Sequence, residues 1–126
     1  IDCTPACLGR DPWLLKELSR KTGLIILTNT GYYGAQKNKF IPKEFYNKSA
    51  EMLASEWTSE FQNGIEDSGV KPGFIKIAVD NDSVLSTDHI KIIKAAGLTH
   101  LKTGTVCSNK IYQNMLMFES YSHFTR

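Results

Sequence analysis

The stretch FIKIAV, residues Phe74–Val79, decides the fold of this chain. It is apolar at almost every position, which is typical of a strand that is covered on both faces in a parallel sheet. Side chains alternate along a strand, so Phe74, Lys76 and Ala78 share one face and the aliphatic residues between them share the other. We expect the aliphatic face to pack under helices, with Lys76 on the opposite side.

The lysine in this strand favours a closed barrel over an open sheet. In a doubly wound sheet both faces are dry, and an unpaired ammonium group buried there would be very costly. In a barrel, Lys76 points into the barrel, near the end where active sites are built. The alternative is an edge strand from which the lysine extends to solvent. The strand pattern alone leaves both interpretations open.

Lys76 is also the candidate catalytic residue. Burial favours the neutral amine of a lysine, and a neutral amine is a nucleophile. Such an amine can form a Schiff base with a carbonyl substrate, as in a lyase that needs no metal. It can also react with carbon dioxide to give a carbamate, whose two oxygens can bridge two metal ions.

Strands and helices alternate on both sides of Phe74–Val79. This order, β-α-β-α-β-α-β, predicts a parallel sheet with helical crossovers. We expect Ile1–Thr4 to be the last residues of a strand, and further strands over Leu24–Thr28 and Thr105–Ser108. The helices are expected from an N-cap at Asp11 to a C-cap at Gly23, over Pro42–Asn63, and from a cap at Ser86 or Thr87 to Gly97.

Apolar side chains at three- and four-residue steps predict which faces of the helices are buried. In the first helix they are Trp13, Leu14, Leu15 and Leu18; in the second, Tyr46, Ala50, Leu53, Trp57 and Phe61; in the third, Ile90, Ile93 and Ala96.

Composition places the chain among ordinary soluble domains. It has 126 residues, 41% hydrophobic and 22% charged, and a net charge of +2, which is too balanced to indicate nucleic acid or an anionic membrane surface. No apolar run approaches the ~20 residues of a membrane helix. Three cysteines are an odd count, so we expect free thiols in a reducing, cytoplasmic compartment. The start at Ile1, without Met, leads us to expect a fragment.

Four motifs occur in an order shared with a known family. They are GRDP at Gly9–Pro12, KTGLII at Lys21–Ile26, TGYY at Thr30–Tyr33 and, most specifically, GIEDSGVKPGFIK at Gly64–Lys76. With these motifs the chain resembles the phosphotriesterase family, a branch of the amidohydrolase superfamily. The resemblance runs from Ile1 to about Gly104, so we interpret residues 105–126 as a divergent C-terminal segment.

The resemblance implies part of an eight-stranded (β/α) TIM barrel. Residues 1–104 would form about strands two to five with the intervening helices. It also implies two divalent metal ions, usually zinc, and hydrolysis of small-molecule phosphotriesters, lactones or related esters by a metal-bound hydroxide. Lys76 falls at the family's carboxylated lysine, which bridges the two metals. Tyr32 and Tyr33 would line the substrate pocket.

The chain also departs from the family pattern. Lys76 is one of the six metal ligands that the resemblance implies, and Asn109 stands where a histidine ligand would end the fifth strand. A lone carbamate would not hold two zinc ions. We interpret His89, His100 and His123 as ordinary histidines that replace none of the missing ligands.

Two alternatives to a hydrolase therefore stay open. One is a non-catalytic half-barrel that needs a partner or forms homo-oligomers through its open sheet edges; the other is the Schiff-base lyase. Asp80 and Asp82 follow the central strand and could tune Lys76 or bind a cation, although a solvated turn is the usual role of such residues.

Overall fold

The structure is a computed structural model that describes the backbone of residues 1–112 and the side chains of residues 1–109. It is an α/β fold with parallel strands, as predicted, and is consistent with part of a TIM barrel. Its elements are η1 (Ala6–Leu8), α1 (Pro12–Thr22), β1 (Asn29–Thr30), η2 (Lys43–Asn47), α2 (Ala50–Asn63), β2 (Phe74–Asp80), α3 (Thr87–Thr103) and β3 (Cys107–Tyr112).

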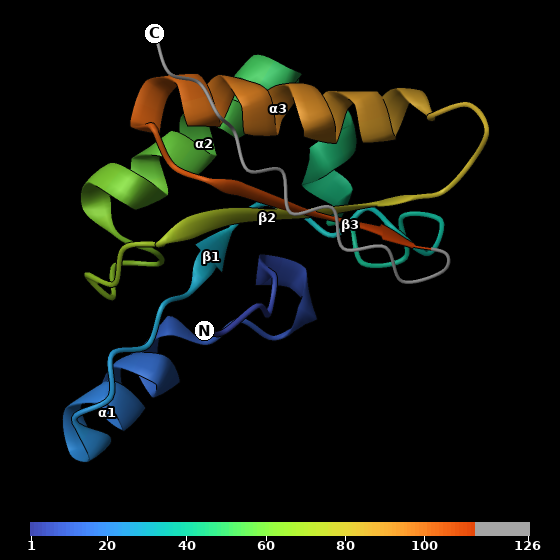
Figure 1. Cartoon of the computed structure of the whole chain (residues 1–126). Helices are drawn as coiled ribbons and strands as arrows, with labels where there is room; N and C mark the ends of the chain where they lie inside the picture. Colours follow the sequence, from blue (N-terminus) through green and yellow to red (C-terminus); the bar gives the residue numbers. More distant parts are fainter. Residues whose placement is uncertain (113–126) are drawn as a thin grey trace, which may run out of the picture.

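The described strands form one parallel sheet in the order β1-β2-β3, so the lysine-bearing strand lies at its centre. β2 is in register with β3 from Ile75 opposite Cys107 to Asp80 opposite Tyr112. Figure 1 shows α2 and α3 together over one face of the sheet, while the N-terminal segment and α1 lie on the other side. Parallel strands joined by helices over one face are the arrangement that the alternating pattern predicted.

The main core lies between the sheet and the two helices. Ile75 and Ile77 of β2 are buried against Leu53 and Trp57 of α2 and Ile92 of α3. Full burial of one such side chain contributes about 1.5–3 kcal/mol. The aliphatic face of β2 therefore packs under helices, as the alternation predicted.

Helix ends follow the capping signals. The Asp11 carboxylate accepts a hydrogen bond from the Leu14 amide at 2.9 Å, and Gly23 ends α1 in the left-handed conformation. Ser86 caps α3 through the His89 amide at 3.1 Å, which decides between the two predicted cap residues. A side-chain cap of this kind contributes about 1 kcal/mol.

Two helix predictions were wrong. The predicted helix Pro42–Asn63 is broken at Lys48, which is extended, and Ser49 caps a new helix through the Met52 amide. A serine that bonds to the backbone two or three residues ahead competes with helix continuation, which explains the break. α3 does not end at Gly97, because the left-handed cap lies at Gly104.

The predicted apolar faces were only partly right. Ala50, Leu53 and Trp57 of α2 are buried, as expected. In α3 the predicted Ala96 is buried, but Ile90 and Ile93 are exposed, and Ile92, Ala95 and Thr99 are buried in their place. Trp13, Leu14 and Leu18 of α1 and Tyr46 of η2 are also exposed. Periodicity identifies an apolar stripe, but neighbouring elements decide whether it is covered.

Strand positions were shifted from those predicted. The apolar run Leu24–Thr28 is not a strand, because pairing with β2 begins at Asn29 and Thr30, and Ile25 is 91% exposed. Ile1–Thr4 has no strand either, although the Asp2 amide donates to the Leu27 carbonyl at 2.7 Å. The strand expected over Thr105–Ser108 is β3, Cys107–Tyr112. Most of the predicted C-terminal segment lies outside the described residues.

Two further findings concern the cysteines and the character of the helices. Cys3, Cys7 and Cys107 are free thiols, as expected from their odd number. In the described part of the chain, no helix has both the length and the apolar character to cross a membrane.

A substitution at Gly31 tests the contact between the loop after β1 and the central strand. Its φ is +110°, and a Cβ atom there would collide with the Lys76 carbonyl oxygen. We expect Gly31→Ala to lower the free energy of unfolding by more than about 2 kcal/mol, measured by urea denaturation. Gly97→Ala is the control, because Gly97 lies in a helix with open space around it. Gly97→Ala should raise the free energy of unfolding by about 0.5–1 kcal/mol. Equal effects of the two substitutions would contradict the contact between Gly31 and Lys76.

Candidate functional site

Lys76 lies near the middle of β2, on the face opposite α2 and α3. Its side chain is half-buried, and its strand position pairs with Ser108 of β3. Burial raises the pKa of the neighbouring Cys107 thiol, while the positive charge of Lys76 lowers it. The charge of Lys76 thus partly offsets the effect of burial on the Cys107 thiol.

The surroundings of Lys76 do not fit a binuclear metal centre formed by the described residues alone. In residues 1–112, the one group of three His, Cys, Asp or Glu side chains that could hold a metal ion is Asp80, Asp82 and His89, and it does not contain Lys76. Metal sites need several converging ligands. We therefore derive no reaction step through a metal bound at Lys76.

The two predicted pocket tyrosines lie in different surroundings. The Tyr32 ring packs edge-on against Phe45 and Trp57, at centroid distances of 6.3 and 5.6 Å, so it belongs to the helix side of the sheet. Burial raises the pKa of Tyr32 to about 12. Tyr33 packs with Ala78 of β2 and against the Phe40 ring, at 5.9 Å. Tyr33, not Tyr32, thus shares a face of β2 with Lys76.

Tyr32 also lines a cavity of about 210 Å³ beside α2. At its wall the buried Arg10 guanidinium forms two bonds to the Glu60 carboxylate, at 2.8 and 3.0 Å, and donates to the Asn29 carbonyl at 2.7 Å. Such paired bonds hold a guanidinium in a fixed orientation. Arg10 therefore ties the first loop to α2 and β1. The lining residues are Ala6, Arg10, Thr30, Gly31, Tyr32, Glu56, Trp57, Glu60 and Glu66.

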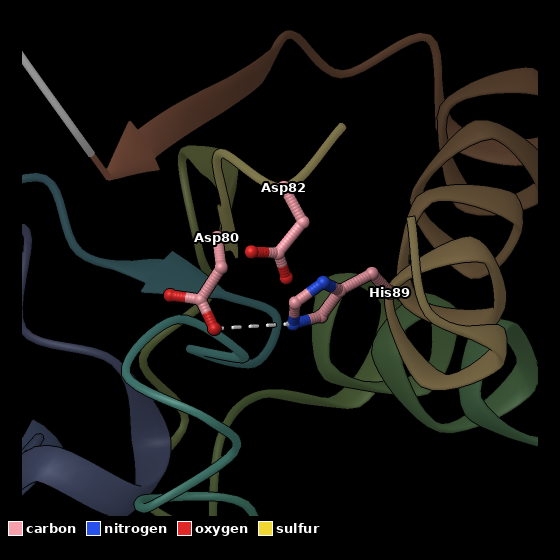
Figure 2. Close-up of side chains that lie close together, drawn as sticks. All are labelled: Asp80, Asp82 and His89. Atoms are coloured by element: carbon pink, nitrogen blue, oxygen red, sulfur yellow. Dashed lines mark ion pairs between the residues drawn. The ribbon is translucent and has the colours of Figure 1, made fainter. Parts of the chain in front are cut away.

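A second cluster lies at the carboxyl end of β2. Asp80 ends the strand, Asp82 follows in the loop, and His89 belongs to the first turn of α3. Figure 2 shows both carboxylates facing the imidazole ring from the side that carries its nitrogens. One metal-binding atom from each residue lies within 4.8 Å of the others. This grouping was not predicted from the sequence, because His89 was interpreted as an ordinary helix histidine.

Asp80 is held by backbone donors. Its two carboxylate oxygens accept hydrogen bonds from the Gln36 and Lys37 amides, at 2.7 and 2.9 Å. Gln36, Lys37 and Asn38 all have φ between 56° and 60°, a left-handed conformation that is costly for residues other than glycine. Successive amides of such a turn form a concave anion-binding nest, which Asp80 fills.

His89 is almost fully buried, with 3% of its surface exposed. Its Nε2 atom lies 2.9 Å from the Gly34 carbonyl oxygen and 3.9 Å from an oxygen of Asp80. A carbonyl oxygen can only accept a hydrogen bond, so Nε2 must carry the hydrogen. The lone pair of the neutral ring then lies on Nδ1, which is buried and has no hydrogen-bond partner.

Comparison with known proteins gives a consistent result. The profile of the Phosphotriesterase family matches residues 1–121. The chain is 29% identical over 104 residues to the Phosphotriesterase homology protein of Escherichia coli, and 30% identical over 103 residues to the Aryldialkylphosphatase of Saccharolobus solfataricus. The aligned parts are 82% of this chain but 35% and 32% of those relatives, so the chain spans about a third of their length.

The nest around Asp80 predicts that Asp80 contributes more than Asp82 to the free energy of unfolding. In metal-free buffer with a chelator, Asp80→Ala should lower the free energy of unfolding by about 2–3 kcal/mol, because it removes charged acceptors from two amides. Asp82→Ala is the control: this side chain is exposed, and its loss should change stability by less than about 0.5 kcal/mol. Urea denaturation measures both. Equal losses would show that the nest does not depend on Asp80.

Proposed function

The chain belongs to the phosphotriesterase family, and on this premise we propose that it carries the lysine-bearing strand of a metal-dependent hydrolase. The substrates we propose are small phosphotriesters, lactones or related esters. The single observation that carries the proposal is the position of Lys76. It lies on the central strand of a parallel sheet, on the face opposite α2 and α3.

Lys76 is proposed to act as a carbamate. The neutral Nζ atom adds to carbon dioxide, an N–C bond forms, and one proton leaves to solvent, which gives an anionic group with two oxygens. The close approach of Gly31 to the backbone of Lys76 supports this role, because it fixes the strand from which the side chain extends. In the family's centre this carbamate would bridge two divalent ions, with zinc as our proposal, and further ligands would come from residues outside the described stretch.

The tyrosines are proposed to contribute to substrate binding in different ways. Tyr33 is the better candidate for a contact near Lys76, because it packs on the same face of β2. Tyr32 lines the cavity beside α2 and would take part only if substrate reaches that cavity. We further propose a reducing, cytoplasmic location, which the three free thiols support.

Carbamate formation can be measured without any metal. In buffer with ¹³C-labelled bicarbonate, we expect one carbamate carbonyl resonance in the ¹³C NMR spectrum of the chain. Lys76→Ala should abolish it, whereas Lys102→Ala should leave it, because Lys102 is an exposed helix lysine. Absence of the resonance would overturn the proposed role. Borohydride trapping of a small aldehyde at Lys76 alone would instead favour the Schiff-base lyase.

A second candidate function is self-association as a half-barrel. β1 has only two paired residues, and the apolar side chains before it are uncovered in the described structure: Leu24 and Ile25 are 64% and 91% exposed. Exposed apolar groups beside an open strand edge favour pairing with another chain. We propose a second copy of this chain as the partner.

Light scattering after size-exclusion chromatography tests this candidate. We expect a dimer whose population falls on dilution, and Ile25→Lys should shift it toward monomer. Leu101→Lys is the control, because Leu101 is 80% exposed but lies on α3, away from β1. A monomer at every concentration would refute the proposed dimer.

A further inference from the structure

We propose that Asp80, Asp82 and His89 bind one divalent transition-metal ion at the carboxyl end of β2. The proposal does not rest on the role of Lys76. Lys76 lies four positions before Asp80 on β2, roughly 13 Å away along the strand. The site is therefore separate from the position at which the family resemblance expects metal.

The spacing of the three side chains suits one ion. One carboxylate oxygen of each aspartate and one of the two imidazole nitrogens of His89 lie within 4.8 Å of one another. Ligands at about 2.0–2.2 Å from a zinc ion are at most about 4.4 Å apart, so the observed separation is close to that of a formed site. Asp82 is exposed and lies in a loop, and its side chain can close the remaining gap. The ligands come from three elements, the strand, the loop and the helix (Figure 2).

The imidazole of His89 is the observation that points to a ligand rather than to a solvated acidic loop. Its bond to the Gly34 carbonyl leaves an unpaired Nδ1 in a buried position. A buried polar atom that has lost its water without gaining a partner destabilises the fold. Figure 2 shows the Asp82 carboxylate beside this nitrogen, so two electron-rich groups face each other. A cation between them would satisfy both, and a neutral imidazole is the form that binds metal.

Asp80 is already oriented for this role. The Gln36 and Lys37 amides each take one lone pair of its carboxylate, and each oxygen keeps another for a cation. Hydrogen bonds of this kind around a ligand fix its direction and strengthen binding. The positive end of the α3 dipole disfavours a cation here, but its effect is small beside the charges of two carboxylates.

The ligand set indicates the class of metal. One imidazole with two carboxylates suits Zn²⁺ or Mn²⁺. Calcium prefers sites made entirely of oxygen ligands, which would leave the imidazole unused. The three donors leave coordination positions for water.

The test uses Zn²⁺ as the probe on the chain stripped with a chelator. Long-range ¹H–¹⁵N NMR correlations report each imidazole nitrogen separately. At one equivalent of Zn²⁺ we expect a His89 nitrogen to shift as a metal ligand, while His100 stays unchanged, because it is not one of the three side chains of the cluster. The nitrogen that shifts identifies the coordinating atom. If the His89 nitrogens do not shift, the proposal is wrong.

Calorimetry with matched variants gives the second readout. Loss of an outer contact typically weakens metal binding about 10–100-fold, so Asp82→Asn, which removes a direct ligand, should weaken it at least tenfold. Asp67→Asn is the control, because Asp67 is an exposed turn residue with φ 56° that asparagine also tolerates. Unchanged affinity in Asp82→Asn would overturn the proposal and point to the exposed thiols of Cys3 and Cys7.

The variant Lys76→Ala shows whether the proposed metal site is independent of the proposed Lys76 carbamate. We expect it to lose the carbamate resonance and to keep both the His89 shift and the Zn²⁺ affinity. Loss of Zn²⁺ binding in Lys76→Ala would contradict a separate site, whatever the fate of the carbamate. Amide spectra of each variant show whether it keeps its fold.

Discussion

The burial of Ile75 and Ile77 under α2 and α3 is the constraint on which the rest of the structure depends. A strand has two faces, and commitment of one face to the helices leaves the other for Lys76. A shift of one residue in register would exchange these faces and place the ammonium group in the core. The packing of two isoleucines therefore decides the position of the lysine on which the proposed hydrolase depends.

At the carboxyl end of the same strand, Asp80 has both a structural role and a proposed role as a metal ligand. Asp80 closes β2 and holds a left-handed turn through the Gln36 and Lys37 amides, while one of its oxygens lies 3.9 Å from His89. The carboxylate thus has a structural role that fixes its orientation, and this orientation makes it suitable as a ligand. Residues that end parallel strands commonly gain such roles, because the following loops converge at that end of the sheet.

Family membership and the described residues agree on the fold but differ on the site. The phosphotriesterase profile covers residues 1–121, and the parallel sheet has the expected connections. Around Lys76, however, the described side chains do not form a binuclear centre, whereas a different cluster with a buried, unpaired nitrogen lies further along the strand. The proposed carbamate and the proposed metal site are therefore separate hypotheses about one strand.

The sequence by itself determined the local features: the alternation of Phe74–Val79, the caps at Asp11 and Gly23, the N-cap of α3 to within one residue, and the parallel order of elements. Each depends on neighbours within a few residues, which periodicity and side-chain chemistry encode. Only the tertiary structure decided that Leu24 and Ile25 are uncovered, and that His89 lies beside Asp80 and Asp82. These depend on how elements pack across loops, and the distance between two elements has no periodic signal in the chain.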